Sequence, residues 1–307
     1  MLLVASPNLC LDRIVVVRGF AAGRVQRAAS ATELASGKGL NVARAARALD
    51  VDVRVVGCVG EGHAARTILR DAPAYGIRLD AVRVPGPVRV CTLIIDPGQR
   101  ETVINEPGPS VSAEALRALH ACVRAGLKRA RVVVLAGSLP PGVPATFYAD
   151  VIRQAQAIPV ILDATGEALR VGVAARPYLV KANELELQDA VGRPLDSPEA
   201  VRKAAEEIGR IAGAAVLITL GARGALLVTP QGAWQLVPPE VDRVNTIGAG
   251  DSLTAGLAAG LLRGLPLREA ARLGVAAAAA DVTTLLPGTV DAALVEQLVP
   301  RVGVHAR

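Results

Sequence analysis

The stretch Val244-Asn245-Thr246-Ile247-Gly248-Ala249-Gly250-Asp251-Ser252 decides how the rest of this sequence is interpreted. Two glycines precede a carboxylate, and the Ala/Leu-rich segment Leu253 to Leu262 that follows is typical of a helix. Glycine lets the backbone turn sharply and approach a ligand closely. The start of a helix offers unpaired N–H groups and the positive end of the helix dipole, so this loop is a candidate anion site.

Asp251 is the unexpected residue of this stretch, because a carboxylate repels an anion bound at the same helix start. One interpretation is a general base that accepts a proton from a hydroxyl beside a bound phosphate. The other is that Asp251 caps the helix, since Asp is a favoured capping residue. From this stretch alone both interpretations stay open.

The composition limits the class of protein. The chain has 307 residues, of which 51% are hydrophobic, enough for one large α/β domain or two small ones. The formal net charge of +6 is spread along the chain without a run of five like charges, and aromatic residues make up only 2%. Nucleic acid is therefore a poor candidate partner, since base stacking needs aromatic side chains, whereas small anionic substrates suit a mildly basic protein.

The cysteines and histidines predict no zinc site and no disulfide framework. The four cysteines, at positions 10, 58, 91 and 122, are far apart without a C-x-x-C pair, and the three histidines do not cluster. This usage favours a reducing cytoplasm. Met1 to Ala5 is apolar but lacks a basic n-region, which favours a first strand over a signal peptide. No apolar run reaches 18 residues, so we expect no membrane-spanning helix and no membrane partner.

Short apolar strands alternate with helices along most of the chain. Ser112 is expected to cap a helix that runs to about Arg129, and Ser197-Pro198-Glu199 to begin another. The alternation predicts a mainly parallel sheet covered by helices on both faces. The predicted strands of this sheet are Met1 to Ala5, Val51 to Val59, Val132 to Leu135, Val160 to Leu162, Tyr178 to Val180, Ala215 to Thr219 and Ala225 to Val228.

A different pattern occupies residues 88–105. Val88 to Ile95 and Glu101 to Asn105 are joined by a turn that begins Asp96-Pro97-Gly98, which is a β-hairpin signature. A hairpin among βα units suggests a small sheet that projects from the main domain. Arg89 is its notable polar residue, and is either exposed to solvent or a ligand for a phosphate.

Three loops at the carboxyl ends of strands carry candidate functional groups, and ligands bind at this edge of open α/β sheets. The alternative is that these residues have no functional role and are ordinary turn residues and solvated side chains. Together they could supply the anion site, base, metal ligands and hydroxyl donors that phosphoryl transfer needs. The groups are Gly248 to Asp251; Lys181 with Asn183 and Glu186; and Asp12, Lys38, Asn41 and Arg89.

Two other nucleotide-binding motifs are absent. The Walker pattern G-x-x-x-x-G-K-[ST] does not occur, although Ser36-Gly37-Lys38-Gly39-Leu40-Asn41 is a Gly-rich loop before a helix. The dinucleotide pattern G-x-G-x-x-G would need glycine at position 253, where this chain has Leu253. A dehydrogenase is therefore not expected.

On these residues the chain resembles the PfkB (ribokinase-like) carbohydrate kinase family over nearly its whole length. Within the family it is similar to the hexose-phosphate branch of 1-phosphofructokinases, tagatose-6-phosphate kinases and minor 6-phosphofructokinases. The stretch Thr246–Ser252 matches the second family signature, and Gly37–Ala43 matches the first signature of the branch. The further matching blocks are Gly137–Gly142, Asp163–Leu169, Asn183–Glu186 and Leu220–Ala225.

The resemblance implies an ATP- and Mg²⁺-dependent kinase of a phosphorylated ketohexose, with fructose 1-phosphate as the favoured acceptor and fructose 6-phosphate and tagatose 6-phosphate as alternatives. Asp251 would be the catalytic base. The implied roles of the other residues are an anion hole at Gly248, Ala249 and Gly250; sugar binding by Asp12 and Asn41 with the loop glycines Gly37 and Gly39; binding of the sugar's phosphate by Lys38 and Arg89; ATP binding by Lys181, Thr219, Gly221 and Gly224; and Mg²⁺ binding, through water, by Asn183 and Glu186.

The implied fold is a single ribokinase-like three-layer α/β/α domain over residues 1–307. It would carry a small β-sheet lid from about Asp12 to Leu34 and Val88 to Asn105, which excludes water from the reaction. Open strand edges in the lid make a homodimer an expectation.

Four positions depart from the branch pattern. Ser36 replaces a glycine, Ala182 a proline, and Val88 and Cys91 the threonine and asparagine that usually flank Arg89. The last two touch the sugar-phosphate site, so the identity of the hexose phosphate stays open. The rival hypotheses are a sugar-phosphate-binding regulator without turnover, which an intact Asp251 argues against, and a nucleic-acid-binding protein, which the scattered arginines argue against.

Overall fold

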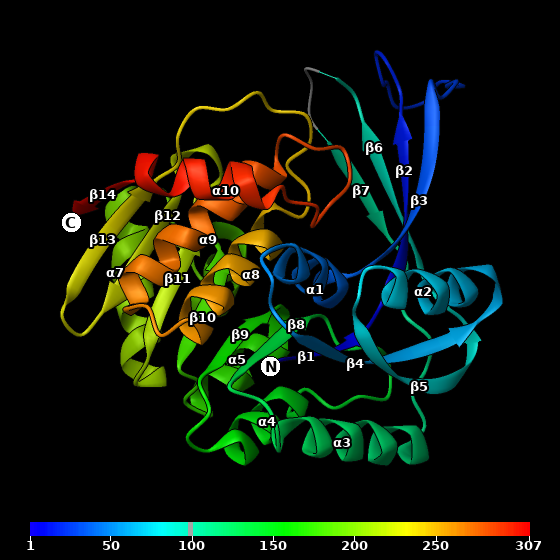
Figure 1. The fold of residues 1–307 in the computed structure, drawn as a ribbon, viewed down its shortest axis with the longest axis horizontal. Helices are drawn as coiled ribbons and strands as arrows, with labels where there is room; N and C mark the ends of the chain where they lie inside the picture. Colours follow the sequence, from blue (N-terminus) through cyan, green and yellow to red (C-terminus); the bar gives the residue numbers. More distant parts are fainter. Residues whose placement is uncertain (98–100) are drawn as a thin grey trace.

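A ten-stranded sheet forms the centre of the protein, seen in a computed structural model that describes residues 1–97 and 101–307 (Figure 1). The strands from β11 to β5 are parallel, as predicted, while β12, β13 and β14 extend the sheet with antiparallel strands. In spatial order the strands are β14 (Gly303–Ala306), β13 (Gly232–Val237), β12 (Ala225–Thr229), β11 (Ala215–Thr219), β10 (Leu179–Asn183), β9 (Val160–Ala164), β8 (Val132–Gly137), β1 (Leu2–Asn8), β4 (Val53–Glu61) and β5 (Arg78–Pro87).

Helices cover both faces of this sheet, which confirms the predicted three-layer α/β/α arrangement (Figure 1). One face carries α1 (Lys38–Ala48), α2 (Gly62–Ala74), α8 (Ala249–Leu262), α9 (Leu267–Asp281) and α10 (Ala292–Leu298). The other carries α3 (Ala113–Leu127), α4 (Phe147–Ala155), α5 (Gly166–Ala174), α6 (Glu184–Val191) and α7 (Pro198–Ala212). Two short 3₁₀ helices lie at Gly221–Arg223 and Val299–Arg301.

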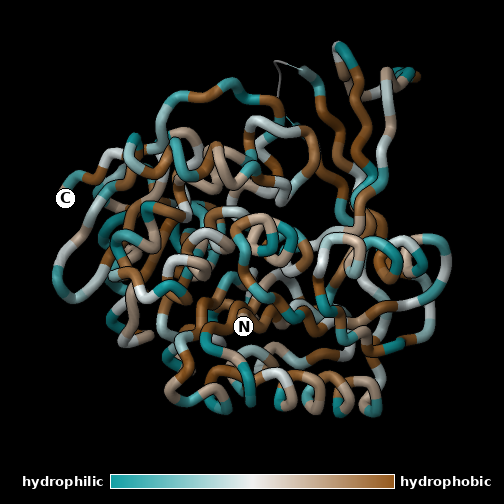
Figure 2. The backbone as a smooth tube through the Cα atoms, in the orientation of Figure 1, coloured by the Kyte–Doolittle hydropathy of each residue, from teal (hydrophilic) through white to brown (hydrophobic). Residues whose placement is uncertain are grey.

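The strand β1 illustrates why the central strands are apolar at every residue: both of its faces are covered by helices. Successive side chains of a strand point to opposite faces. Leu2 and Val4 join the hydrophobic core on the α1/α8 side, while Leu3 and Ala5 join the core on the α3/α4 side. All four are at most 1% exposed. Figure 2 shows this hydrophobic centre, with more hydrophilic segments toward the outside of the molecule.

A second sheet of four strands projects from the large domain (Figure 1). Its order is β3 (Ser30–Ser36), β2 (Cys10–Val16), β6 (Val90–Ile95) and β7 (Thr102–Asn105). The hairpin predicted for residues 88–105 is confirmed by the antiparallel pair β6/β7, although its turn at Gly98 lies outside the described residues. We call this four-stranded sheet the lid.

Several predicted boundaries were wrong. Asp12 and Asn183 lie inside β2 and β10 and are not loop residues that follow a strand, because β2 begins at Cys10, before its β-branched stretch, and β10 continues past its apolar stretch. The strand β5 was not predicted, since it is an edge strand whose polar and charged residues can face solvent. The helices α5, α6 and α10, the edge strand β14 and its neighbour β13 were also missed.

The capping hypothesis for Asp251 is also wrong. The helix α8 begins at Ala249, and its N-cap is Gly248, so Asp251 is the third helical residue and its side chain makes no capping hydrogen bond. The helices that begin after Ser112 and Ser197 are capped as predicted, since each serine hydroxyl accepts a hydrogen bond from a backbone N–H of the first turn.

Candidate active site

A cleft of about 1050 Å³ lies between the carboxyl edge of the large sheet and the lid. It brings together residues from two of the three groups that the sequence singled out, while Lys181, Asn183 and Glu186 are not among the residues that line it. The predicted residues among those that line it are Asp12, Gly37, Lys38, Asn41, Arg89, Gly248 and Asp251.

The first turn of α8 forms one wall of this cleft, and its shape requires glycine. Gly248 has φ +95°, in the left-handed region, and a Cβ at this position would lie 2.7 Å from the Cβ of Pro287. A Cβ on Gly250 would lie 3.1 Å from the Nζ of Lys181. Gly248 lines the cleft and Lys181 lies beside Gly250, so the positive end of this helix has a buried cation next to it, as an anion site needs.

Asp251 lies at the bottom of the cleft and is 7% exposed. Its Oδ2 accepts a hydrogen bond of 2.9 Å from the Nδ2 of Asn41, which fixes the carboxylate. Burial raises the pKa of Asp251 to about 6, and the positive charge of Lys38 opposes this increase. A carboxylate with this pKa is ionised near neutral pH and is still basic enough to accept a proton in a reaction.

Asp163, at the end of β9, is the centre of the charge network beside Asp251, and its role was not predicted. It is fully buried. Its Oδ1 accepts a hydrogen bond of 2.8 Å from Lys38, and its Oδ2 accepts hydrogen bonds from Lys181 at 3.1 Å and Thr254 at 2.9 Å. Burial alone would raise the pKa of Asp163, but the two lysines outweigh it and lower the pKa to about 2. Its place in a matching sequence block, Asp163–Leu169, was the available signal.

Lys38 lines the cleft, and its side chain points toward Asp163 and Glu186. Its Nζ donates to Asp163 and, at 3.1 Å, to the Oε1 of Glu186. Although burial opposes it, the carboxylates of Asp163, Glu186 and Asp251 raise the pKa of Lys38, which therefore stays charged. The predicted contact of Lys38 with a sugar's phosphate would need these ion pairs to rearrange.

Asn183 and Glu186 form a capping box at the start of α6. The Asn183 side chain accepts a hydrogen bond of 2.8 Å from the N–H of Glu186, and the Oε2 of Glu186 accepts one of 2.9 Å from the N–H of Asn183. Both residues therefore have a structural function. This leaves the Oε1 of Glu186, which lies beside Lys38 and Asp163, as the carboxylate oxygen that faces the site.

This arrangement fits a hydrated Mg²⁺ ion. Two carboxylates, Asp163 and Glu186, already converge on one cation, the Nζ of Lys38. Mg²⁺ prefers oxygen ligands and usually keeps several water molecules. Because the capping box uses one oxygen each of Asn183 and Glu186, these residues are better placed to hold the ion through water than to bind it directly.

The predicted ATP residues lie at the ends of β10 and β11. Lys181 is buried and paired with Asp163 beneath the first turn of α8. The hydroxyl of Thr219 contacts the carbonyl oxygen of Ala182 at 3.5 Å. Gly221 has φ +59° with open space around its Cα, so a ligand can approach there. Gly224 is different, because a Cβ at this position would lie 1.9 Å from the carbonyl oxygen of Leu236, and close packing alone explains this glycine.

On the lid side of the cleft, Ser36 connects two of the predicted sugar ligands, at the position where the family resemblance implies a glycine. Its hydroxyl lies 2.5 Å from the Oδ2 of Asp12 and 2.9 Å from the Oδ1 of Asn41, and so links the two predicted sugar ligands. Arg44 donates to the same Asn41 oxygen at 3.3 Å and to the carbonyl oxygen of Pro287 at 2.6 Å. Neither Ser36 nor Arg44 was predicted as part of the site.

Arg89 lines the lid side of the cleft with part of its guanidinium unused. One of its Nη atoms donates to the carbonyl oxygen of Asn8 at 2.9 Å, while its buried Nε has no partner within the described residues. The Nε is shielded from solvent, so a ligand in the cleft would meet the Nη end of the guanidinium instead. The two loop glycines bring α1 close to β1: Gly37 has φ +99°, and a Cβ on Gly39 would lie 2.2 Å from the Cβ of Ser6.

The sequence comparisons identify the family of this chain. Residues 3–292 match the pfkB family carbohydrate kinases. A 1-phosphofructokinase of Rhodobacter capsulatus is 38% identical over 275 residues, which cover 88% of this chain and 87% of that protein. A 1-phosphofructokinase of Bacillus subtilis is 33% identical and covers 99% of both chains.

A solved structure agrees as well. The tetrameric inhibited form of phosphofructokinase-2 from Escherichia coli is 28% identical, covers 98% of both chains and superposes with a TM-score of 0.87. The fold and site thus define an ATP-dependent carbohydrate kinase. The chain belongs to the pfkB carbohydrate kinase family.

Proposed function

We propose that this chain transfers the γ-phosphate of ATP to a primary hydroxyl of a phosphorylated ketohexose, and that fructose 1-phosphate is the favoured acceptor, giving fructose 1,6-bisphosphate. The observation that carries the proposed chemistry is the buried carboxylate of Asp251, which lies in the first turn of α8 and faces a cleft large enough for a sugar phosphate. The choice of fructose 1-phosphate rests on the relatives named 1-phosphofructokinase, at 31% to 38% identity.

In the proposed reaction Asp251 accepts the proton of the acceptor hydroxyl while the oxygen attacks the γ-phosphorus in line, the bond from the γ-phosphorus to the bridging oxygen breaks, and ADP leaves. The hydrogen bond from Asn41 keeps the receiving carboxylate in one orientation. The N–H groups of the first turn of α8 stabilise the negative charge on the transferred phosphoryl group, with Lys181 behind them. A bound Mg²⁺ ion, held through water by Asn183, Asp163 and Glu186, would neutralise further phosphate charge.

The acceptor would lie between α1 and the lid. Asp12 and Asn41 would bind sugar hydroxyls, and Arg89, which lines the cleft, would bind the phosphate that the sugar already carries. Lys38 would reach the same phosphate or the transferred one after exchanging its present partners. Closure of the lid would exclude water, which otherwise competes with the sugar as acceptor.

Fructose 6-phosphate and tagatose 6-phosphate are the second candidates. The structure of Escherichia coli phosphofructokinase-2 in complex with fructose 6-phosphate is 27% identical with a TM-score of 0.85. In this chain Val88 and Cys91 flank Arg89, so contacts near the acceptor's phosphate can differ between relatives.

The test is ADP release by the purified protein with MgATP against fructose 1-phosphate, fructose 6-phosphate, tagatose 6-phosphate, fructose, ribose and adenosine. We expect a strong preference for one phosphorylated hexose. Faster turnover of ribose or adenosine than of any sugar phosphate would contradict the proposed substrate class. If no compound is turned over, a sugar-phosphate-binding regulator becomes the better hypothesis.

We also propose that the lid forms a homodimer. Its edge strand β7 exposes Val103 and Ile104, at 42% and 56%, and an unpaired strand edge readily pairs with another chain. Light scattering of the purified protein tests this, and the substitution Ile104→Asp should shift the protein toward monomers. A monomeric wild-type protein at micromolar concentration would contradict it.

A further inference from the structure

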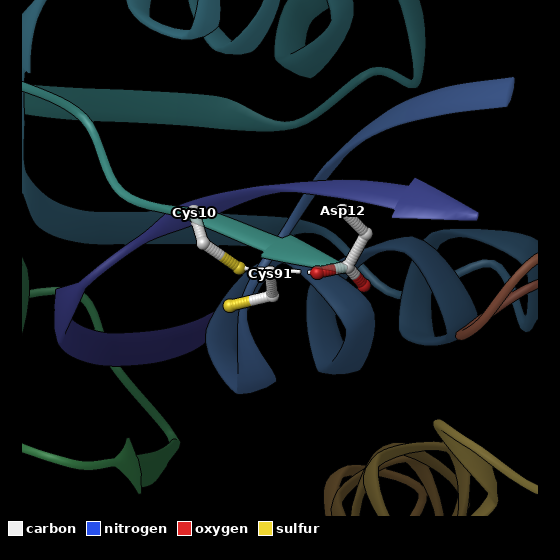
Figure 3. Close-up of side chains that lie close together, drawn as sticks. All are labelled: Cys10, Asp12 and Cys91. Atoms are coloured by element: carbon white, nitrogen blue, oxygen red, sulfur yellow. Dashed lines mark hydrogen bonds between the residues drawn. The ribbon is translucent and has the colours of Figure 1, made fainter. Parts of the chain in front are cut away.

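Three side chains on the lid side of the cleft form a cluster that their spacing in the sequence did not predict. The sulfur atoms of Cys10 and Cys91 and a carboxylate oxygen of Asp12 all lie within 4.8 Å of one another. The Sγ of Cys10 lies 3.3 Å from the Oδ1 of Asp12. Figure 3 shows the two sulfurs and the carboxylate side by side, with Cys10 and Asp12 on β2 and Cys91 on β6. The spacing of the cysteines predicted no zinc site, and this cluster arises only in the folded chain.

The register of the lid creates this cluster. Asp12 and Cys91 are opposite each other in the parallel pair β2/β6. Cys10 precedes Asp12 by two residues, and side chains two apart on a strand point to the same face. All three residues are buried, at 2%, 5% and 3% exposure, but they line the cleft, which provides a path for entry.

The donor atoms suit a soft divalent cation. Zn²⁺ prefers thiolate and carboxylate ligands in a tetrahedral arrangement, and sites that bind a further ligand keep one position open. Zn–S and Zn–O bonds of about 2.3 and 2.1 Å place neighbouring donors about 3.6 to 3.8 Å apart in a tetrahedron. The donors observed here need to move only slightly to reach these separations. Mg²⁺ and Ca²⁺ are poor candidates, because they prefer oxygen ligands.

The surroundings favour such an ion. The hydroxyl of Ser36 donates to the Oδ2 of Asp12, which fixes the carboxylate and leaves its Oδ1 beside the sulfurs. Ile14, Leu93 and Ile95 pack around the two cysteines and exclude water on that side. Two thiolates and one carboxylate with a divalent cation carry one net negative charge, which Arg89, two residues before Cys91 and lining the same cleft, can balance.

A disulfide between the two cysteines is less compatible with the register. Cys10 and Cys91 are diagonal neighbours on adjacent strands, and such positions lie roughly 7–8 Å apart. Disulfides need Cα atoms that are usually closer than about 7 Å, so the strands would have to shift. A shared cation needs no such shift.

We propose that Cys10, Asp12 and Cys91 bind a soft divalent cation, with Zn²⁺ as the natural candidate, whose fourth coordination position opens into the cleft. Because Asp12 is also the proposed ligand of a sugar hydroxyl, the cation and the acceptor sugar compete for the site. The competition, unlike the metal site itself, rests on the proposed function. The bound cation would therefore inhibit the kinase.

The experiment uses untagged protein that has been reduced and freed of metal with a chelator. Co²⁺ serves as the spectroscopic probe, because thiolate ligands give an intense sulfur-to-cobalt absorption band, and Zn²⁺ is then titrated against it. We expect one Co²⁺ per chain, displaced by Zn²⁺. The variants Cys91→Ser and Cys10→Ser should each lose the band and weaken Zn²⁺ binding by at least about 100-fold, since even changes around a metal's ligands cost 10- to 100-fold.

The matched control is Cys58→Ser, which removes another buried cysteine, in β4, outside the cluster. It should keep the band and the affinity. Circular dichroism checks that each variant is folded. Because Cys10→Ser and Cys91→Ser each remove one proposed metal ligand, the test still gives an answer if one of these variants does not fold. Absence of the band in the wild-type protein, or wild-type affinity in a folded ligand variant, would overturn the metal site. If the protein binds no Co²⁺ but forms a disulfide between Cys10 and Cys91 in air, the metal site is wrong and the two cysteines are a redox pair instead.

Competition is measured separately, by titrating fructose 1-phosphate into the Co²⁺-loaded protein. We expect the sugar phosphate to weaken Co²⁺ binding in proportion to its concentration. If the band persists while the kinase turns over normally, competition is wrong although both the metal site and the proposed function stand. If no sugar phosphate is turned over but the band is present, the proposed function fails and the metal site does not.

Discussion

The first turn of α8 and the lid face the same cleft, but charged side chains are held differently in the two regions. Near α8, Asp163 and Lys181 form an ion pair whose side chains are 0% and 4% exposed. In the lid, Arg13 and Glu33 form an ion pair whose side chains are 51% and 29% exposed. Buried charges depend on their partners, whereas solvent replaces a lost partner at the surface. Substitutions of charged residues are therefore easier to accommodate at the exposed surface of the lid than beside α8.

The sharpest test of this contrast is the substitution Asp251→Asn. We expect kcat to fall by about 10² to 10⁴, because an amide cannot accept the proton of the acceptor hydroxyl. The amide oxygen can still accept the hydrogen bond from Asn41, so the fold should be retained. Steady-state kinetics with MgATP and the best acceptor measures the effect, with Asp242→Asn, at an exposed position, as control. Unchanged kcat in the Asp251 variant would remove the assigned base.

The next largest effect is expected on stability, from Asp163→Asn. This change leaves Lys38 and Lys181 without their shared carboxylate, and removing one partner of a buried ion pair costs about 3–5 kcal/mol. The matched lid variant Glu33→Gln should cost at most about 1 kcal/mol, since its ion pair is exposed. Urea denaturation measures both. Equal losses would contradict the contrast between the two regions.

The same carboxylate has a defined pH dependence. Its pKa in the folded protein, about 2, lies below its ordinary value of 3.8. A lowered pKa means that the contribution of Asp163 to stability is fully present above pH 3.8 and is lost as the pH falls toward 2.

Substitution of Arg89 tests the lid side of the site. We expect Arg89→Gln to raise the KM for the phosphorylated acceptor about 10- to 100-fold with little change in the KM for ATP, because hydrogen bonds to a charged group contribute about 1.5–3 kcal/mol. Arg83→Gln, at an exposed position of β5, is the control. Equal effects of both substitutions, or an effect confined to ATP, would contradict the proposed phosphate contact.

The smallest expected effect is the pH dependence of catalysis. Because Asp251 must be ionised to accept a proton and its pKa is raised to about 6, kcat/KM should be level above pH 7 and fall about tenfold per unit below pH 6. A rate profile between pH 5 and 8 measures this. A profile that is flat down to pH 5 would show that no group with this pKa limits the reaction.

The order of apolar and polar segments was enough to predict the class of fold. Runs such as Leu2 to Ala5 are apolar on every residue, which indicates a strand buried on both faces, and the regular alternation with helices predicts a parallel sheet. The loop residues Asp251, Lys38 and Asn41 could be placed at one edge of that sheet, and they do line one cleft. Edge strands such as β5 were missed because their mixed polarity resembles that of loops.

Contacts between distant residues could not be predicted in this way. Nothing in the spacing of Asp163 and Lys38, 125 positions apart, indicates their ion pair. Nor does it indicate that Lys38 points toward Glu186, or that Ser36 links Asp12 to Asn41. Each of these contacts depends on which strands are neighbours and on the direction in which a side chain leaves its strand.

The sequence alone therefore determined the layers of the fold, the family resemblance and the position of the glycine-rich helix start, because periodicity and backbone freedom are local properties of a chain. The tertiary structure decided that Asp251 is buried rather than a cap, that Asp163 joins two lysines, and that Cys10 and Cys91 meet across β2 and β6. These features arise only when strand pairing brings separate segments within hydrogen-bonding distance and removes water from between them.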